Sequence, residues 1–439
     1  MKYKAENIVN ISEKIKSDEI VIQARKKDKD FTRNRKITVK DIIYYDLNKK
    51  GLSSKMELDK FIDICQIGNV SSPAMLKQRR KLNSEVFRYL KNQSLNLFYK
   101  EFKEEVKTYK GWLLFAADGS DFEIPNTNKC KKQYNSPIKG KSNEPMCARA
   151  NIGNMYDLLN NYVVDTVIKP YQSDEIKMMQ ENLRVAKELV DNYKIIRIMD
   201  RGYVSLEDIY LSQLNNDKYI VRLKKKDFGI ERKNIKTNDE FINIGYVKTR
   251  MYYYENKNPE LIEYLKSGNL LNVRVVNIVL STGEMETLIT NLGKNEMTYE
   301  ELNELYRLRW GIETSYHYLK ESMKIETITS SNEDIIKQDI LSQMFVFNIL
   351  QSFQNDAEED IKQDDYKHKM KININMATGY IKQYLIYILL EEDSELRDSY
   401  MSILYEKILK HIVPIRPNRK YERKKDVKNK HHINKRKTF

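Results

Sequence analysis

The chain has 439 residues, of which 41% are hydrophobic, and a formal charge of +14 at neutral pH. This length predicts two to four domains with buried cores, and the absence of any window of about 18 uncharged apolar residues argues against a membrane span. The first residues lack the apolar core of a signal peptide, so we expect a cytoplasmic protein. The positive charge favours a polyanionic partner.

The first hundred residues have the pattern of short amphipathic helices. Helices are expected over 37–51 and 55–67, and Ser72 is a suitable N-cap for a third helix, with a proline at its first position. A helix, a short turn and a basic helix form the outline of a helix-turn-helix DNA reader. We therefore predict a helical DNA-binding domain over residues 1–105, whose third helix carries Lys77, Arg79 and Arg80.

Strands and helices alternate in the middle of the chain. The order is three strands, a helix, a strand, a helix and a strand, which is typical of an α/β sheet. The apolar run 112–117 reads as a strand that ends in a turn at Asp118-Gly119-Ser120, and the run 194–199 ends in Asp200-Arg201-Gly202-Tyr203. Open α/β sheets bind ligands at the carboxyl ends of their strands. A single aspartate there is more often a turn residue or a helix cap.

The pattern changes between residues 227 and 297. Two strand-like runs, 273–280 and 285–292, flank Ser281-Thr282-Gly283-Glu284, which has the composition of a hairpin turn. We interpret this segment as a β-rich insertion that divides the α/β domain into a first part, 106–226, and a second part, 298–360.

A strong helix signal follows the insertion. Thr298 and Glu301 fit a capping box, and the helix is expected to run to about residue 324. Four polar residues on it have offsets of 0, 3, 7 and 14, which place them within about 60° of one another on one face. An acid between two cations and a tyrosine suits a metal ligand beside a bound phosphate; a solvated charge stripe is the alternative. The four are Tyr306, Arg309, Glu313 and Lys320.

The C-terminal part is expected to be helical and then strongly basic. An apolar helix over 335–353 is predicted to cover the sheet, with an acidic loop over 356–365, further helices in the segment 361–412 and a basic tail over 413–439. From Arg416 onward the tail has eleven Lys and Arg against two acids, a net charge of +9. Such a run either binds nucleic acid or keeps the protein in solution.

These motifs together resemble the IS4 family of bacterial insertion-sequence transposases, which are of the DDE type. The resemblance covers about residues 30 to 350, and its signature spacing of tyrosine, arginine, glutamate and lysine is matched without a gap. It implies an α/β fold with an RNase H-like catalytic core interrupted by a β-rich insertion. An α-helical N-terminal DNA-binding domain and a helical, basic C-terminal region complete the expected architecture.

The resemblance also implies a chemistry. Asp118, Asp200 and Glu313 would bind two Mg2+ ions, for which Mn2+ can substitute, and would catalyse cut-and-paste transposition by cleaving transposon ends and joining them to target DNA. The expected partners are double-stranded DNA, as terminal inverted repeats and target, and a second copy of the chain in a homodimeric synaptic complex. The expected DNA contacts are Tyr306, Arg309, Trp310, Lys320, Arg201, Lys77, Arg79 and Arg80.

Several points stay open at this level. Trp310 is either a base-stacking residue or a core anchor. In the family that the chain resembles, an aromatic residue of the insertion assists a DNA hairpin intermediate by pushing out a base. This insertion has no tryptophan, so the hairpin step stays open. Four tyrosines could replace the tryptophan: Tyr252, Tyr253, Tyr254 and Tyr264. The two alternative functions are a catalytically silent, domesticated DNA-binding protein and an RNase H-like DNA nuclease without strand transfer.

Overall fold

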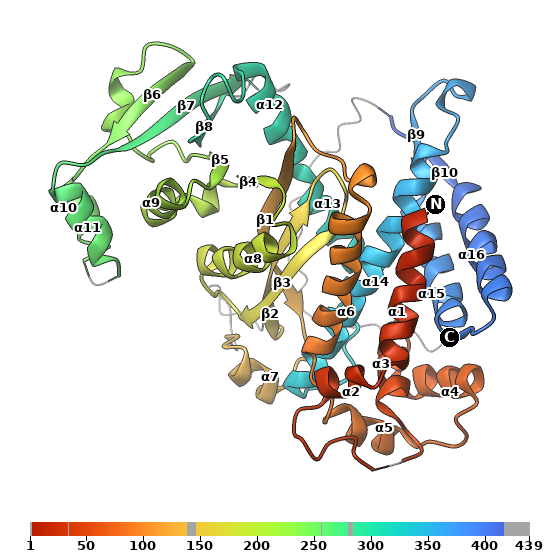
Figure 1. The fold of residues 1–439 in the computed structure, drawn as a ribbon. Helices are drawn as coiled ribbons and strands as arrows, with labels where there is room; N and C mark the ends of the chain where they lie inside the picture. Colours follow the sequence, from red (N-terminus) through yellow and green to blue (C-terminus); the bar gives the residue numbers. More distant parts are fainter. Residues whose placement is uncertain are drawn as a thin grey trace.

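A computed structural model describes residues 2–416 apart from 34, 138–145, 256, 280–282 and 284. A mixed eight-stranded sheet forms the centre, and helices cover both of its faces (Figure 1). Helices from the two ends of the chain form a bundle beside the β3 edge of this sheet. The predicted α/β class is therefore confirmed.

The strand order in the sheet is β3-β2-β1-β4-β5-β8-β7-β6. The strands β1, β4 and β5 are parallel to one another, and every other pairing is antiparallel. The order of strands and helices predicted for the middle of the chain is also confirmed. The bounds are β1 (Trp112–Glu123), β2 (Arg149–Asp157), β3 (Val163–Pro170), β4 (Lys194–Met199), β5 (Lys218–Arg222), β6 (Asp239–Ile244), β7 (Leu271–Val279) and β8 (Met285–Thr290).

The first strand is longer than predicted. Asp118, Gly119 and Ser120 do not form a turn, because β1 continues through them to Glu123. The reason is the neighbouring strand β2, which pairs with β1 as far as Glu123, whereas the parallel strand β4 ends at Met199. The expected turn at Asp118 is thus wrong, and the carboxylate projects from a continuous strand.

The insertion extends the central sheet. The strands on either side of the predicted hairpin turn, β7 and β8, pair as expected, and β8 also pairs with β5, so the insertion continues the same sheet. Residues 281, 282 and 284 of the predicted turn lie outside the described residues. Two short helices join β6 to β7, namely α10 (Lys248–Met251) and α11 (Pro259–Lys266).

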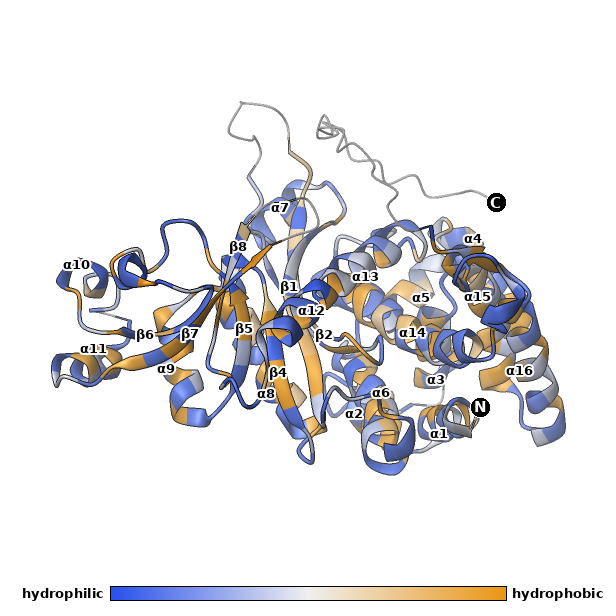
Figure 2. Cartoon of the chain, turned by 90° about the horizontal axis from the view of Figure 1, so that it is seen from above, coloured by the Kyte–Doolittle hydropathy of each residue, from blue (hydrophilic) through white to orange (hydrophobic). Residues whose placement is uncertain are grey.

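Two helical layers cover the parallel strands. The side chains of Phe115 and Ala117 face α8 and α9, whereas those of Leu114 and Ala116 face the layer of α12 and α13. Figure 2 shows hydrophobic residues along β4 and β5, between these layers. The bounds are α7 (Asn128–Gln133), α8 (Glu175–Leu189), α9 (Leu206–Asn215), α12 (Tyr299–Leu308) and α13 (Trp310–Glu321).

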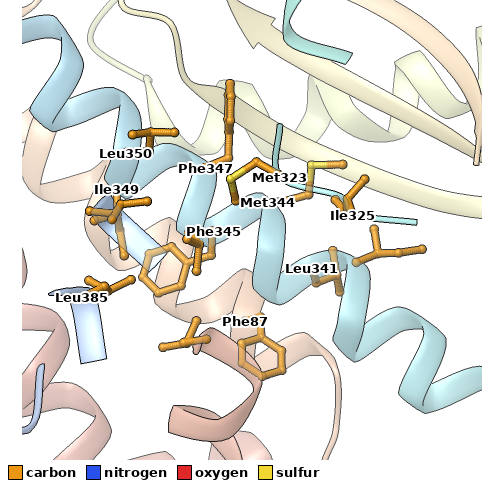
Figure 3. Packing of buried hydrophobic residues seen from close by; sticks show 14 of the residues in the cluster. Phe87, Met323, Ile325, Leu341, Met344, Phe345, Phe347, Ile349, Leu350 and Leu385 are labelled. Carbon is orange, nitrogen blue, oxygen red and sulfur yellow. The ribbon is translucent and has the colours of Figure 1, made fainter. Parts of the chain in front are cut away.

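The bundle is organised around α14, whose middle is buried on all sides (Figure 3). A helix that is buried all round, as this one is with both its apolar and its polar residues, needs other elements on every side. The N-terminal helices and the C-terminal pair supply that cover, so residues 1–105 share a core with the C-terminal region. The bounds are α1 (Lys2–Lys16), α2 (Glu19–Ala24), α3 (Val39–Leu47), α4 (Ser54–Cys65), α5 (Ser72–Arg79), α6 (Glu85–Asn96), α14 (Glu333–Glu359), α15 (Ile374–Leu390) and α16 (Ser394–Leu409).

Two details of the C-terminal region differ from expectation. The predicted acidic loop begins later, because α14 continues to Glu359. A two-stranded sheet, β9 (Met370–Ile372) with β10 (Ile412–Pro414), closes the pair α15–α16. The basic tail beyond Arg416 lies outside the described residues. No helix in the described part of the chain is both long and apolar enough to span a bilayer.

Candidate active site

The register of the parallel strands brings the two predicted aspartates together. Ala117 of β1 pairs with Met199 of β4; Asp118 is the next residue of β1, and Asp200 is the first residue after β4. Adjacent strands lie about 4.8 Å apart, and side chains alternate between the two faces of a sheet. Asp118 and Asp200 therefore share the face that α12 and α13 cover.

Asp118 is a desolvated carboxyl group. Its Oδ1 accepts a hydrogen bond from Gly119 N at 2.9 Å. Burial raises the pKa of Asp118 to about 7, against the opposing effects of the Gly119 N–H and the Arg309 guanidinium. Burial of an ionised carboxylate is costly unless a cation or several donors compensate for the lost water. A bound cation would supply that compensation here.

Asp200 lies at the end of β4, beside the last residue of β5. Its Oδ1 is buried without a hydrogen-bond partner among the described residues, and Arg222 Nη1 is 4.0 Å away. Met199 pairs with Val221 of β5, so the next residues, Asp200 and Arg222, are neighbours across the sheet. Asp118 is the neighbour of Asp200 on the other side. Arg222 was missed in the sequence, where only the register of three strands could have identified it.

The signature residues lie on two helices. The predicted single helix is interrupted at Arg309, which ends α12 and begins α13, although the capping box of Thr298 and Glu301 is confirmed. The guanidinium of Arg309 is buried, and its Nη2 donates to Glu313 Oε1 at 2.8 Å. The acid and the arginine of the signature therefore bind each other in this state.

Tyr306 lies deeper than a DNA contact would. Its side chain is buried, and its hydroxyl oxygen has no hydrogen-bond partner within the described structure. Burial raises its pKa to about 12; the Arg309 guanidinium opposes that rise, and the carboxylate of Asp200 adds to it. The phenol is thus a neutral, unpaired group facing the same cluster.

Lys320 is attached to the strand that carries the first aspartate. Its Nζ donates to Ser120 Oγ at 2.8 Å and to the backbone oxygen of Asp121 at 2.7 Å. Burial lowers its pKa, and the Glu326 carboxylate, 4.0 Å from the ammonium group, opposes that effect. In this state the half-buried lysine ties α13 to β1.

Trp310 and Arg201 are accessible. Trp310 is 52% exposed, which contradicts the interpretation of this residue as a core anchor. Arg201 follows Asp200 in a short 3-10 turn, and its side chain is exposed. Both side chains can reach a ligand at this edge without any rearrangement of the core.

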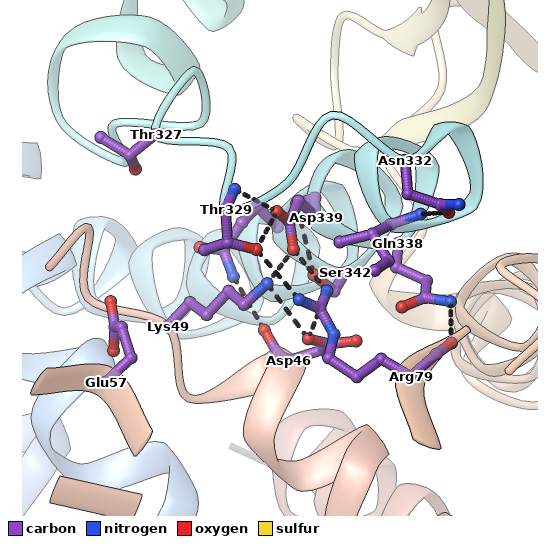
Figure 4. Close-up of polar contacts among 12 residues, drawn as sticks. Asp46, Lys49, Glu57, Arg79, Thr327, Thr329, Asn332, Gln338, Asp339 and Ser342 are labelled. Atoms are coloured by element: carbon purple, nitrogen blue, oxygen red, sulfur yellow. Dashed lines mark hydrogen bonds and ion pairs between the residues drawn. The ribbon is translucent and has the colours of Figure 1, made fainter. Parts of the chain in front are cut away.

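The three basic residues predicted on α5 separate into two groups. Lys77 and Arg80 are exposed. Arg79 is 2% exposed, and its Nη2 lies 2.9 Å from Asp46 and 2.6 Å from Asp339, in a cluster with Lys49 and Thr329 (Figure 4). A guanidinium enclosed in this way cannot reach DNA, so the expectation for Arg79 requires correction: its charge joins α3, α5 and α14.

The insertion tyrosines divide similarly. Tyr252 and Tyr253 are 79% and 62% exposed. Tyr254 is buried, and its hydroxyl accepts a hydrogen bond from Leu206 N at 3.2 Å. The Tyr264 hydroxyl accepts one from Gln213 at 3.0 Å. The first two are therefore the exposed ones, and the Lys257 ammonium lies over the Tyr253 ring, 3.6 Å from its centre.

The carboxylates suit a hard divalent cation, because Mg2+ takes oxygen ligands and Asp200 has a buried oxygen with no other partner. No group of three His, Cys, Asp or Glu in the described residues is arranged to hold a metal ion, however. Glu313 is bound by Arg309 at 2.8 Å in this state.

Comparison with known proteins gives three findings. The family model described as "Transposase DDE domain" matches residues 112–349, a range that contains all three carboxylates. A candidate transposase of insertion sequence element IS4SA from Synechocystis sp. is 26% identical over 155 residues, which are 35% of this chain and 40% of that relative. The chain thus matches less than half of the relative's length.

A remote likeness is found among solved structures. The piggyBac transposase in its synaptic complex with hairpin DNA has a TM-score of 0.46 and 9% sequence identity to this chain. The match covers 91% of this chain and 85% of that one.

Proposed function

The chain belongs to the transposase DDE domain family, and on that premise we propose that it cuts and joins DNA at a site made by Asp118, Asp200 and Glu313. The observation that carries the proposal is the register of β1 and β4, which aligns the two aspartates beneath the helix that bears Glu313. We assign this arrangement to an RNase H-like core, extended by the insertion over residues 227–297.

The proposed cofactor is a pair of Mg2+ ions, for which Mn2+ can substitute. Bound between carboxylates and substrate phosphates, two such ions activate an oxygen nucleophile and stabilise the leaving oxygen of a phosphodiester. Asp118 and Asp200 would hold the ions from rigid strands, and Glu313 would complete the ligand set from α13. Asp118 is half-buried, and its partial desolvation favours a bound cation.

The proposed DNA contacts come from several surfaces. Trp310 and Arg201 lie beside the carboxylates with exposed side chains, so the first can stack on a base and the second can bind a phosphate. Tyr306, Arg309 and Lys320 would reach DNA only after leaving their present surroundings. Lys77 and Arg80, on and just after α5, would contact the DNA duplex at a distance from the carboxylates.

A basic hollow of 560 Å3 adds to the N-terminal surface. It lies between α3 and the segment before it, and Phe31 lines it with a left-handed backbone conformation. We assign it to the DNA backbone because five of its lining residues are cationic: Lys29, Arg33, Arg35, Lys40 and Lys81. Phosphate contacts of this kind fix the position of a protein on DNA rather than its sequence preference.

The proposed substrates are the terminal inverted repeats of a mobile element and a target duplex, and the proposed active assembly is a homodimer on paired ends. Tyr252 and Tyr253 are the candidates for assisting a hairpin step, since both rings are exposed, whereas the hydroxyls of Tyr254 and Tyr264 accept hydrogen bonds from Leu206 and Gln213.

The test uses purified full-length protein, Mg2+ and a duplex carrying the repeats that flank the gene. Glu313→Gln should lose end cleavage and keep DNA binding, whereas Glu304→Gln, an exposed control on α12, should retain both. Cleavage by Glu313→Gln at the wild-type rate would overturn the assignment. Wild-type protein that cleaves without producing joined target DNA would be a nuclease, and one that only binds would be a silent DNA-binding protein.

A further inference from the structure

The Arg309 guanidinium interacts with all three of the proposed carboxylate ligands. Its Nη2 is 2.8 Å from Glu313 Oε1, and only 9% of the arginine side chain is exposed. Its charge also acts on Asp118 and Asp200. In the DNA-free protein, one cation of the chain therefore offsets part of the negative charge of the site that is assigned above to divalent cations.

Arg222, the other arginine of the site, is in a different situation. It lies 4.0 Å from Asp200 but is bound at 2.7 Å to Glu286 of β8. Glu286 is outside the proposed ligand set, so Arg222 has a permanent acidic partner of its own. Within the described part of the chain, the ion pair of Arg309 is instead with Glu313, which the metal would need.

A divalent ion and this guanidinium compete for the Glu313 carboxylate. Two like charges a few ångströms apart repel each other, and the Glu313 Oε1 that accepts from Arg309 is not available to a metal at the same time. The competition ends if another anion takes the arginine. A DNA phosphate is that anion: it binds arginine through two parallel hydrogen bonds, and the exposed indole of Trp310 lies next to Arg309 for a neighbouring base.

Resting on the proposed function, we propose that Arg309 is a positioning residue with two alternative partners. In the free protein it holds Glu313 away from the metal site, and a DNA phosphate releases Glu313 by taking the guanidinium. Metal binding and DNA binding then strengthen each other, and by thermodynamic linkage the factor is the same in both directions. The exchange swaps one ion pair for another and makes no covalent change.

The test measures equilibrium binding of Mn2+ to the full-length protein by electron paramagnetic resonance, with and without a duplex carrying the flanking repeats. DNA should tighten Mn2+ binding to the wild type about tenfold or more, a coupling of ordinary size for linked sites. Arg309→Gln should bind Mn2+ tightly without DNA and lose most of the dependence on DNA. The control is Arg307→Gln, which removes a positive charge from an exposed side chain two residues before Arg309. This variant should behave as the wild type.

Two results would overturn the inference. One is Mn2+ binding to the wild type that does not change when DNA is added, a measurement that needs no variant. The other is a folded Arg309→Gln protein, checked by circular dichroism, that binds Mn2+ no more tightly than Arg307→Gln does. Asp118→Asn separates this failure from failure of the proposed function: if it binds Mn2+ as the wild type does, the metal site itself is misassigned.

Discussion

The hydroxyl of Tyr316 on α13 donates to the backbone oxygen of Asp118 at 2.8 Å and accepts a hydrogen bond from Asn154 N at 3.0 Å. Ile152 O lies 3.0 Å from the same hydroxyl. A buried side chain three residues after Glu313 is thus fixed to the backbone of the first aspartate. This contact sets the height of Glu313 above the sheet.

Tyr316→Phe should therefore impair catalysis more than DNA binding. Removing the hydroxyl leaves buried backbone groups without a partner, at a cost of about 1–3 kcal/mol in the free energy of unfolding. The freed α13 would also displace Glu313. Urea denaturation and end-cleavage rates check the two effects, and Tyr318→Phe, which lacks these bonds, is the control. Wild-type cleavage by Tyr316→Phe would show that the contact does not position the helix.

The Arg79 cluster should be a large contribution to stability. Asp339 binds both Arg79 and Lys49, so Arg79→Met leaves buried charge uncompensated, and we expect a loss of about 3–5 kcal/mol in the free energy of unfolding. Arg80→Met, at the exposed neighbouring position, should stay within about 0.5 kcal/mol of the wild type. Chemical denaturation of both proteins measures the difference. Equal stabilities would mean that the cluster does not join α5 to α14.

Trp310→Ala should leave folding intact and weaken end binding. Because the indole is 52% exposed, its loss should change the free energy of unfolding by less than about 0.5 kcal/mol. Stacking on a base contributes about 1–3 kcal/mol to binding. Titration of the duplex end by fluorescence anisotropy tests this, and Trp310→Phe should recover part of the affinity. A stability loss as large as that of a core substitution would instead make the indole a packing residue.

Lys382 of α15 predicts a pH dependence of stability. Its Nζ donates to the carbonyl of Met323, and burial lowers its pKa to about 8, with Glu57 opposing that shift and Lys324 and Lys50 adding to it. Between pH 8 and about 10.4, the unperturbed value, the unfolded chain then binds more protons than the folded one. The contribution of Lys382 to stability therefore rises with pH across this window.

Lys382→Met should consequently stabilise the protein at pH 7 relative to the wild type, and the difference should shrink towards pH 10. Urea denaturation of the two proteins at matched pH values gives the difference directly, so that the titration of other groups cancels. A difference that is constant from pH 7 to pH 10 would show that Lys382 titrates equally in the folded and unfolded states.

Local sequence patterns predicted the secondary structure correctly where contacts between residues close together in the chain decide it. The alternation of apolar runs and amphipathic segments predicts the order of strands and helices in the middle of the chain, and the capping box at Thr298 and Glu301 marks the start of α12 where the structure has it. These features depend on backbone propensities and on hydrogen bonds within one turn of helix.

Contacts between distant residues decided the rest. Arg79 has the pattern of a surface cation on a basic helix, and its burial depends on Asp339, which is 260 positions away. Arg222 is inconspicuous in the sequence, and only the register of β4 with β5 places it beside Asp200. The role of such a side chain depends on which charged groups lie beside it in space. The periodicity of hydrophobic residues along the sequence does not show which groups these are.

The sequence by itself determined the order of secondary structure and the signature spacing that led to Asp118, Asp200 and Glu313. The tertiary structure decided that β1 runs on past Asp118, that the signature helix is interrupted at Arg309, and that Arg309 and Glu313 pair with each other. The physical reason is the balance of charge at the site: the guanidinium of Arg309 is buried, and a buried charge needs a partner of opposite sign, which Glu313 supplies.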